Sequence, residues 1–426
     1  MKKLLFYFKG LFFALFLVLV SGSCLKTNVA PNSATSPIHF HNGTSNLAVT
    51  SSFGIAGTLA TKDGGFVVYG SAQSLTSGGG FGGSDIFLMR FDKSGNESWF
   101  KDYNNQGVIF GISEATDGGF VLFTGGNFQI GSGIFGYTNY LLKTDEGGKE
   151  VWLKPVLNNL GNFNMTGLCV GKDGAIYTVG NQNVNGMWSN FIYKANGNGD
   201  SLWLRTIQLN GIAPGAMYTP VYSMICDVDG SLVCCLSAEV NYVAGTSFYM
   251  ARFDSAGNSR SYRNVFSFPA GYSPGQFRSP MTIDASGNYN LSFSMVKTVS
   301  TSPPAIANQC NNITIYKNFN VLSSHVLDTA TTSSNIFFLN DNAGNIYELV
   351  QGKPYISYGQ NEGTFSFTKK NSQGVVVTNK TYPGTPCGLY FNSNNDIVVS
   401  GTSLNPLSDF STIFTLELDQ NGQPVK

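Results

Sequence analysis

The residue types that most often carry catalysis or bind metals are few in this chain. It has three histidines, and two of them, His39 and His41, are spaced so that a strand would place both on one face. No third ligand lies near them in the sequence, so we expect no metal site there. The run Gly271-Tyr272-Ser273-Pro274-Gly275 has the spacing of a nucleophile elbow, but no helix pattern or suitable histidine accompanies it. Neither pattern predicts catalysis.

Carboxylates are the remaining side chains that could act as catalytic groups. Glu239, Glu362 and Asp409 are candidates for acid and base groups near the centre of a closed fold. General acid–base catalysis on a glycosidic bond needs two carboxylates within roughly 5 to 10 Å of each other. The positions of these residues in the chain do not establish such a distance. No phosphate-binding glycine–lysine loop is present, and we expect no cofactor. An enzyme of carbohydrate or peptide processing is therefore the alternative interpretation, and a non-catalytic protein is the favoured one.

Composition restricts the elements that could position such groups. Of the 426 residues, 50 are glycine, only 12% are charged and 42% are hydrophobic. This combination favours a large core of strands joined by glycine turns over charged surface helices. The 25 basic and 25 acidic side chains cancel, so the chain lacks the positive charge of a nucleic-acid-binding protein.

The N-terminus has the features of an export signal. Lys2 and Lys3 precede an apolar run, Leu11–Val20, and the small residues of Ser21–Ser23 precede Cys24. This pattern resembles the lipobox of bacterial lipoproteins, in which the cysteine carries the lipid. It implies a signal peptide over residues 1–23, lipidation at Cys24, a flexible tether over 24–36 and a lipid-anchored protein of the outer membrane or cell surface. An ordinary cleaved signal peptide with an incidental cysteine is the alternative.

The rest of the chain is built from repeats. Asp63-Gly64-Gly65-Phe66-Val67-Val68 returns as Asp117-Gly118-Gly119-Phe120-Val121-Leu122 and then in weaker copies. The first glycine or its replacement recurs every 51 to 57 residues, at positions 64, 118, 174, 230, 287, 344 and 395. Asp-Gly between apolar runs predicts a tight two-residue hairpin turn.

A second signature follows in each repeat: an apolar strand that ends in Asp or Asn, with glycine three residues later, as in Asp92 and Gly95. We name the four strands of a repeat A to D, with A and B joined at the Asp-Gly turn and C and D at the second turn. The D strand of the first three repeats carries a tryptophan four residues after that glycine. Lys or Arg stands two residues before the strand-ending Asp or Asn at positions 90, 143, 194, 252 and 369, and this regularity predicts a structural pairing.

Seven repeats of four antiparallel strands predict an all-β fold, a seven-bladed β-propeller over residues 37–426. The chain ends too soon after Gly422 for a full D strand in the last blade, and Pro37–His41 is predicted to supply it. The strand ending in Arg90-Phe91-Asp92, followed by Gly95 and Trp99, resembles the β-propeller repeats of Bacteroidetes-type extracellular lipoproteins and, loosely, Kelch repeats. The resemblance implies this fold and an exported address, and it assigns no catalytic residue.

This topology separates two faces of the disc. The short A–B and C–D turns share one face, and the longer B–C and D–A connections, such as Asn127–Thr138, Asn181–Ser189 and Val299–Asn311, share the other. Variable loops on a rigid scaffold commonly carry function. We therefore expect a glycan, peptide or partner protein to bind the long-loop face, with Trp188 the strongest candidate because the other three tryptophans share a D-strand position. The candidate binding residues are Phe81, Tyr137, Trp188, Tyr218, Tyr242, Tyr272, Arg278 and Tyr355.

Six cysteines follow Cys24, without the spacing of a disulfide framework. Four of them fall in predicted A or B strands of the third and fourth repeats, where thiols pack as small hydrophobes. A two-residue turn at Asp229-Gly230 would place Val233 opposite Cys226. We expect mostly free thiols.

Overall fold

The structure is a computed structural model of the full chain. It describes residues 38–41, 51–74, 85–103, 107–131, 134–156, 163–184, 187–207, 209, 221–239, 246–274, 281–284, 286–301, 304–328, 336–341, 343–353, 363–392, 394–404 and 411–425. Compactness divides the chain into Met1–Ser36 and Pro37–Lys426, and the second unit carries all of the described residues. No helix in these residues is long and apolar enough to cross a bilayer.

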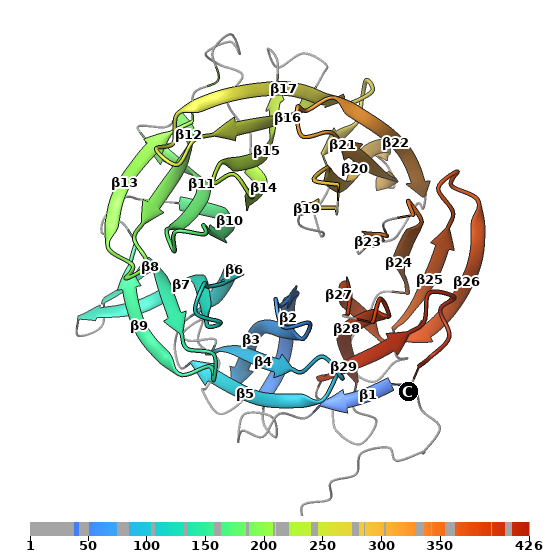
Figure 1. The fold of residues 1–426 in the computed structure, drawn as a ribbon, viewed down its shortest axis with the longest axis horizontal. Helices are drawn as coiled ribbons and strands as arrows, with labels where there is room; N and C mark the ends of the chain where they lie inside the picture. The colour runs from blue at the N-terminus through green and yellow to red at the C-terminus, as the bar shows by residue number, and fades with distance from the viewer. Residues whose placement is uncertain are drawn as a thin grey trace, which may run out of the picture. The chain divides into compact units, whose positions relative to one another are not determined.

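Seven antiparallel sheets form the ring shown in Figure 1, which confirms the predicted seven-bladed β-propeller. Each sheet is one blade, and within it the strands are ordered from the innermost strand at the centre of the ring to the outermost strand at its rim. The strands of blades one to three are β2 (Ser51–Ala60), β3 (Phe66–Ser74), β4 (Asp85–Phe91) and β5 (Glu97–Tyr103); β6 (Val108–Glu114), β7 (Phe120–Gly131), β8 (Ile134–Thr144) and β9 (Glu150–Pro155); and β10 (Phe163–Val170), β11 (Ile176–Val184), β12 (Met187–Ala195) and β13 (Ser201–Thr206).

Blades four to seven follow the same order. Their strands are β14 (Val221–Cys226), β15 (Leu232–Glu239), β16 (Thr246–Phe253) and β17 (Ser259–Ser267); β18 (Ser273–Pro274), β19 (Thr282–Ile283), β20 (Tyr289–Thr301), β21 (Pro304–Ile315) and β22 (Val321–Asp328); β23 (Ile336–Asn340), β24 (Ile346–Lys353), β25 (Thr364–Lys370) and β26 (Val376–Pro383); and β27 (Thr385–Phe391), β28 (Ile397–Leu404), β29 (Ser411–Leu418) and β1 (Ile38–His41). Blade five departs from the pattern because two short pieces, β18 and β19, take the place of its inner strand.

The ring closes as predicted, with the N-terminal strand completing the last blade. β1 pairs antiparallel with β29, with Ile38 opposite Leu416 and His41 opposite Ile413. Figure 1 shows β1 at the rim beside β29. Backbone hydrogen bonds therefore join residues from opposite ends of the chain, and the last blade has its outer strand.

In each of the fourteen A–B and C–D turns one of the described residues has a positive φ angle, and the turns are longer than the predicted two-residue hairpins. In the first turn Gly64 N donates to Thr61 O at 2.9 Å and Thr61 N donates to Gly65 O at 3.0 Å. The A–B turn of the fourth blade likewise has five residues, 227–231. Cys226 therefore lies opposite Leu232, and the predicted pairing with Val233 is wrong. The positive-φ residues are Gly64, Gly118, Gly174, Gly230, Gly287, Gly344 and Asn395 in the A–B turns, and Gly95, Gly148, Gly199, Gly257, Phe319, Gly374 and Gly422 in the C–D turns.

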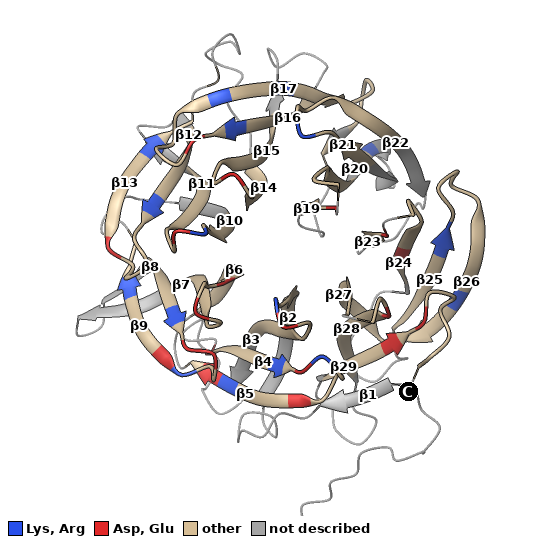
Figure 2. Cartoon of the chain, viewed as in Figure 1, with Lys and Arg blue, Asp and Glu red and all other residues tan. Residues whose placement is uncertain are grey.

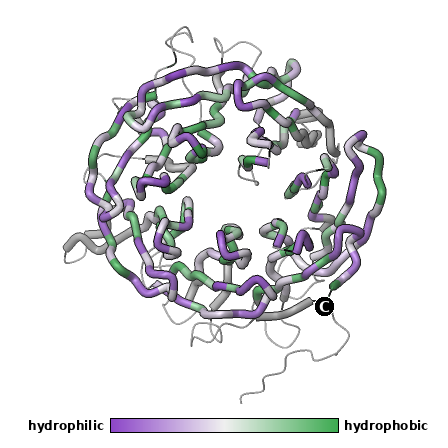
Figure 3. The backbone as a smooth tube through the Cα atoms, in the orientation of Figure 1, coloured by the Kyte–Doolittle hydropathy of each residue, from purple (hydrophilic) through white to green (hydrophobic). Residues whose placement is uncertain are grey.

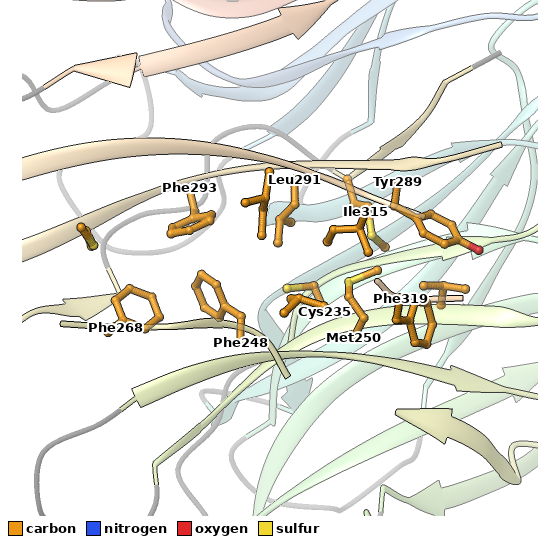
Figure 4. Close-up of a cluster of buried hydrophobic side chains, with 14 residues drawn as sticks. Cys235, Phe248, Met250, Phe268, Tyr289, Leu291, Phe293, Ile315 and Phe319 are labelled. Atoms are coloured by element: carbon orange, nitrogen blue, oxygen red, sulfur yellow. The ribbon is translucent and has the colours of Figure 1, made fainter. Parts of the chain in front are cut away.

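Apolar side chains fill the spaces between neighbouring blades. Six clusters lie among the described residues, between blades one and two, two and three, three and four, four and five, six and seven, and seven and one. Figure 4 shows the cluster between blades four and five, where Phe248 and Met250 face Leu291 and Phe293. Hydrophobic segments recur in the blades around the ring (Figure 3). Burial of this kind is the main favourable term in folding.

The inner strands of blades three and four are also joined covalently. Cys169 in β10 and Cys226 in β14 form a disulfide with their Cα atoms 5.9 Å apart. The prediction of mostly free thiols is wrong for this pair, because neighbouring inner strands approach closely at the centre of the ring. Cys234, Cys235 and Cys387 are free thiols.

Candidate functional site

Most of the sequence-predicted binding residues lie outside the described part of the chain, namely Phe81, Tyr218, Tyr242, Arg278 and Tyr355, together with Cys24, Glu362 and Asp409. Trp188 and Tyr137 are described only in their backbone. They lie in strands β12 and β8, opposite Asn183 and Asn127. The prediction that they sit in loops is wrong, because the strands of these blades pair beyond the expected hairpin ends. Glu239 is the last residue of β15, opposite Thr246.

Tyr272 is the predicted binding residue whose side chain the structure describes. It is half-buried, and its ring packs against the cluster between blades four and five. The Lys297 Nζ lies 5.5 Å from the ring centroid. Contact with a cation on one side and the core on the other gives this ring a packing role in the structure.

Three of the five cations that precede the strand-ending Asp or Asn form the structural pairs that the sequence predicted, namely Arg90, Lys143 and Arg252. The other two, Lys194 and Lys369, lie over aromatic rings of their own blades. Arg90 binds both carboxylate oxygens of Asp63, and Lys143 Nζ lies 2.8 Å from Asp117 Oδ1. Partial burial acts to raise the pKa of Asp63, but hydrogen bonds from Thr61, Arg90 and the Gly65 amide lower it to about 2. In these blades a long cation from the C strand therefore anchors the A–B turn.

The seventh blade reverses the charge at this position. Two residues before Asp419 it has Glu417, where five other blades have lysine or arginine. Figure 2 shows the difference as blue segments in β4, β12, β16 and β25 and a red segment in β29. The A–B turn of blade seven is adapted to it, because Asn392 occupies the position of Asp227, the partner of Arg252 in blade four, and its Nδ2 donates to Glu417 Oε1 at 2.5 Å. A position where one repeat breaks the rule of the others is a candidate for function.

Glu417 lines a pocket of about 240 Å³ between blades seven and one, which we name the seam pocket. Its walls come from the A–B and C–D turns and from the strand residues beside them, so it lies at the short-turn face and not at the predicted long-loop face. The lining residues are Gly64, Phe66, Asp92, Lys93, Ser94, Gly95, Asn96, Glu97, Asn392, Val398, Thr415 and Glu417.

The turn of blade one that forms one wall is fixed by its own hydrogen bonds. Asp92 Oδ1 accepts from the amides of Ser94 and Asn96 at 2.8 and 2.9 Å, and its Oδ2 accepts from Asn96 Nδ2 at 3.2 Å. Partial burial acts to raise the pKa of Asp92, but these hydrogen bonds lower it. Asp92 is therefore ionised at neutral pH and holds the wall in one conformation.

Burial has the opposite result at Glu97, the first residue of β5. It raises the pKa of Glu97 above its ordinary value. The pocket thus brings together carboxylates from two blades, one of which protonates more readily than an exposed glutamate. Glu97 belongs to blade one and Glu417 to blade seven, so only closure of the ring places both carboxylates around one pocket.

Tyr390 lies beside the seam pocket with a buried hydroxyl that has no hydrogen-bond partner. Its ring centroid is 4.8 Å from that of Phe66, and it stands opposite Val398, so two lining residues contact it or pair with it. Burial raises the pKa of Tyr390 well above its ordinary value, and the charge of Glu417 adds to the effect. A buried polar group without a partner calls for a water or a ligand group nearby.

The seam pocket is therefore rich in hydrogen-bond acceptors that are fixed by the fold. Carboxylates accept hydrogen bonds and cannot donate them when ionised. Such a pocket suits a ligand with several hydroxyl donors. Among the described residues, no group of three or more His, Cys, Asp or Glu could hold a metal ion. The sequence carries a signal for Glu417, because this residue differs in charge from the lysine or arginine at the same position of five other repeats. The lengths of the connections instead favoured the opposite face.

Comparison with known proteins identifies a fold and no family. No family model and no curated protein matches the chain. A polysaccharide lyase described as an ulvan lyase is similar over 88% of this chain and 96% of its own, with a TM-score of 0.51 and 12% identity. A protein of unknown function from Bacteroides caccae covers 74% of this chain and 93% of its own, with a TM-score of 0.36 and 10% identity.

An α-L-arabinanase from Penicillium chrysogenum, solved with arabinobiose, is similar over 72% of this chain and 93% of its own, with a TM-score of 0.43 and 13% identity. At these identities a likeness shows the fold alone. The chain is a seven-bladed β-propeller protein, and its solved neighbours include proteins of unknown function as well as glycan-processing enzymes.

Proposed function

We propose that this protein is an exported, lipid-anchored propeller that binds one unit of a neutral, hydroxyl-rich glycan in the seam pocket without transforming it. The observation that carries the proposal is Glu417, which stands where five other blades have lysine or arginine and supplies an acceptor to the pocket. The proposed ligand therefore lies on the short-turn face, opposite the face that the sequence favoured.

The size and charge of the seam pocket support this ligand class. Pockets for drug-sized ligands span roughly 300 to 1,000 Å³. At about 240 Å³ the seam pocket suits a single sugar unit or a chain end. Asp92, Glu97 and Glu417 outnumber Lys93, so a uronate or sulfate group would meet like charge, whereas neutral hydroxyls would donate to these carboxylates.

A binding assay on the full chain tests the proposal. Neutral, uronate-containing and sulfated oligosaccharides are compared for wild type, Glu417→Lys and Glu97→Gln. We expect binding of a neutral glycan and at least a tenfold loss of affinity in Glu417→Lys, because the lysine removes an acceptor. Glu150→Gln is the matched control, since Glu150 has the repeat position of Glu97 in blade two. Unchanged affinity in Glu417→Lys, or binding of the anionic glycans alone, would contradict the proposal.

The lipid anchor is a separate part of the proposal and rests on the residues around Cys24. If Cys24 carries acyl chains, the wild-type protein fractionates with membranes and Cys24→Ser does not. Mass spectrometry of the mature N-terminus provides the check. A mature chain that lacks acyl groups and starts at a residue other than Cys24 would refute the anchor and leave the binding proposal untouched.

A hydrolytic or eliminating enzyme is the second candidate, and the raised pKa of Glu97 favours it. A carboxylic acid with a raised pKa that shares a pocket with a second carboxylate is the arrangement of general acid–base catalysis on glycosidic bonds. This candidate predicts turnover of the bound glycan by the wild type. It also predicts that Glu97→Gln retains binding but loses turnover. A wild type that binds the glycan and releases it intact would rule the enzyme out.

A further inference from the structure

One of the seven spaces between blades is filled differently from the others. Six spaces hold the apolar clusters described above, and among the described residues none of those clusters lies between blades five and six. On the blade-six side of this space, which we name the polar seam, Lys370 Nζ in β25 and Glu348 Oε2 in β24 form an ion pair at 2.7 Å. Both side chains are almost fully buried, with exposed fractions of 11% and 3%.

Hydrogen bonds between amide and hydroxyl side chains extend the polar seam across the two blades. Thr314 Oγ1 in blade five donates to Asn290 Oδ1 at 2.9 Å. Asn340 Nδ2 in blade six donates to the same oxygen at 3.4 Å, near the limit for such a bond. Ser292, two residues along the same face of β20, is also buried.

The repeat shows that these positions are apolar or small elsewhere. Glu348 is the fourth residue after the positive-φ residue of its A–B turn, where the other blades have Val68, Leu122, Thr178, Cys234, Leu291 and Val399. Asn290 is the third, where the others have Val67, Val121, Tyr177, Val233, Tyr347 and Val398. Lys370 directly precedes its C–D turn, where the others have Phe91, Thr144, Ala195, Phe253, Ile315 and Leu418. Charged and amide groups have thus replaced the usual packing on both sides of one space.

We infer that the propeller ring opens between blades five and six, because the buried Glu348–Lys370 ion pair of blade six replaces apolar packing against blade five. In a repeat protein each unit is stabilised chiefly by its contacts with the next, so the weakest contact opens first. Burial of apolar surface stabilises six contacts, whereas desolvation offsets much of the attraction within a buried ion pair. The seam between blades seven and one, where the chain ends meet, has an apolar cluster and the β1–β29 pairing.

Thiol labelling of the native full-length protein tests the inference, because the chain supplies its own references. Cys234 and Cys235 are buried free thiols in the apolar spaces between blades three and four and between four and five. Ser292→Cys adds a thiol at the polar seam, at a buried position that is 8% exposed. With a water-soluble maleimide and peptide mapping by mass spectrometry, we expect the new thiol to react at least tenfold faster than either reference.

Variants of the ion pair test whether its burial weakens the seam. In the Ser292→Cys background, Lys370→Met leaves Glu348 buried without its cation and should raise the labelling rate at least tenfold. Replacing both partners, Glu348→Leu with Lys370→Met, should slow it at least tenfold. Lys369→Met is the matched control, because Lys369 lies over the Tyr347 ring on the other face of the blade, and it should leave the rate unchanged.

Two results would overturn the inference: a Ser292→Cys thiol that reacts as slowly as Cys234, or a rate that the ion-pair variants do not change. If Ser292→Cys fails to fold, hydrogen exchange of the wild type replaces it. Amides of β20 and β24 should then exchange at least tenfold faster than those of β3 and β28, which flank the seam between blades seven and one. Equal or slower exchange in β20 and β24 would refute the opening.

Discussion

Among the described turn residues, Phe319 and Asn395 are the two that adopt positive φ without being glycine, at 66° and 61°. Replacing each with glycine tests whether packing or backbone conformation decides stability at these turns. A left-handed conformation costs an ordinary residue about 1 to 2 kcal/mol, which glycine would recover. Asn395 is exposed, and asparagine tolerates this conformation well, so Asn395→Gly should raise the free energy of unfolding by at most about 1 kcal/mol.

Phe319→Gly should have the opposite sign. Phe319 is 2% exposed, its ring centroid lies 5.9 Å from that of Tyr289, and the Arg252 guanidinium is 5.5 Å from its ring. Removing a buried phenylalanine costs about 3 to 5 kcal/mol, so after the backbone gain the variant should lose about 1 to 4 kcal/mol. Urea unfolding monitored by tryptophan fluorescence measures both variants. A Phe319→Gly protein as stable as the wild type would refute the packing argument.

Three further perturbations test the turns, the disulfide and the ion pairs. Gly199→Ala places a Cβ 2.7 Å from a tryptophan ring at φ +80°, whereas Gly230→Ala has the same φ and an open space, so the first should lower the thermal midpoint clearly more than the second. Replacing Cys169 and Cys226 with serine should lower the free energy of unfolding by about 4 kcal/mol, as the chain-entropy estimate gives for a separation of 57 residues. Free thiols at Cys169 and Cys226, mapped in the wild type under non-reducing conditions, would contradict the bridge. Because the pKa of Asp63 is lowered from 3.8 to about 2 by folding, its carboxylate stabilises the fold above about pH 4 and this contribution is lost as the pH falls through 2. Asp63→Asn should therefore lower the unfolding midpoint at pH 6 and leave it nearly unchanged at pH 2, and an equal shift at both values would argue against the pair.

The number of blades and the closure of the ring could be predicted from the chain alone, because each repeat carries its own turn signature. Gly64 and its six counterparts mark residues that need positive φ, and their spacing counts the blades. The short C-terminal end after Gly422 likewise indicated that Pro37–His41 completes the last blade, as β1 does. Local turn chemistry and strand patterning are properties of neighbouring residues, and a sequence records them directly.

What depends on contacts between blades could not be predicted in the same way. Trp188 lies in β12 and not in the predicted loop, because the length of a strand pair depends on the partner strand as well as on a strand's own residues. The Cys169–Cys226 bridge needs the distance between two inner strands, which only the closed ring provides. The seam pocket joins Glu97 and Glu417 across the ring closure. Glu417 could nevertheless have been found, because it breaks the charge rule of the other strand ends.

A crystal structure of the full chain soaked with a neutral oligosaccharide tests the account most directly. The account predicts a sugar unit in the seam pocket, with hydroxyl groups that donate to Glu417 and Glu97. A sugar bound instead over the B–C and D–A connections, with the seam pocket empty, would contradict it.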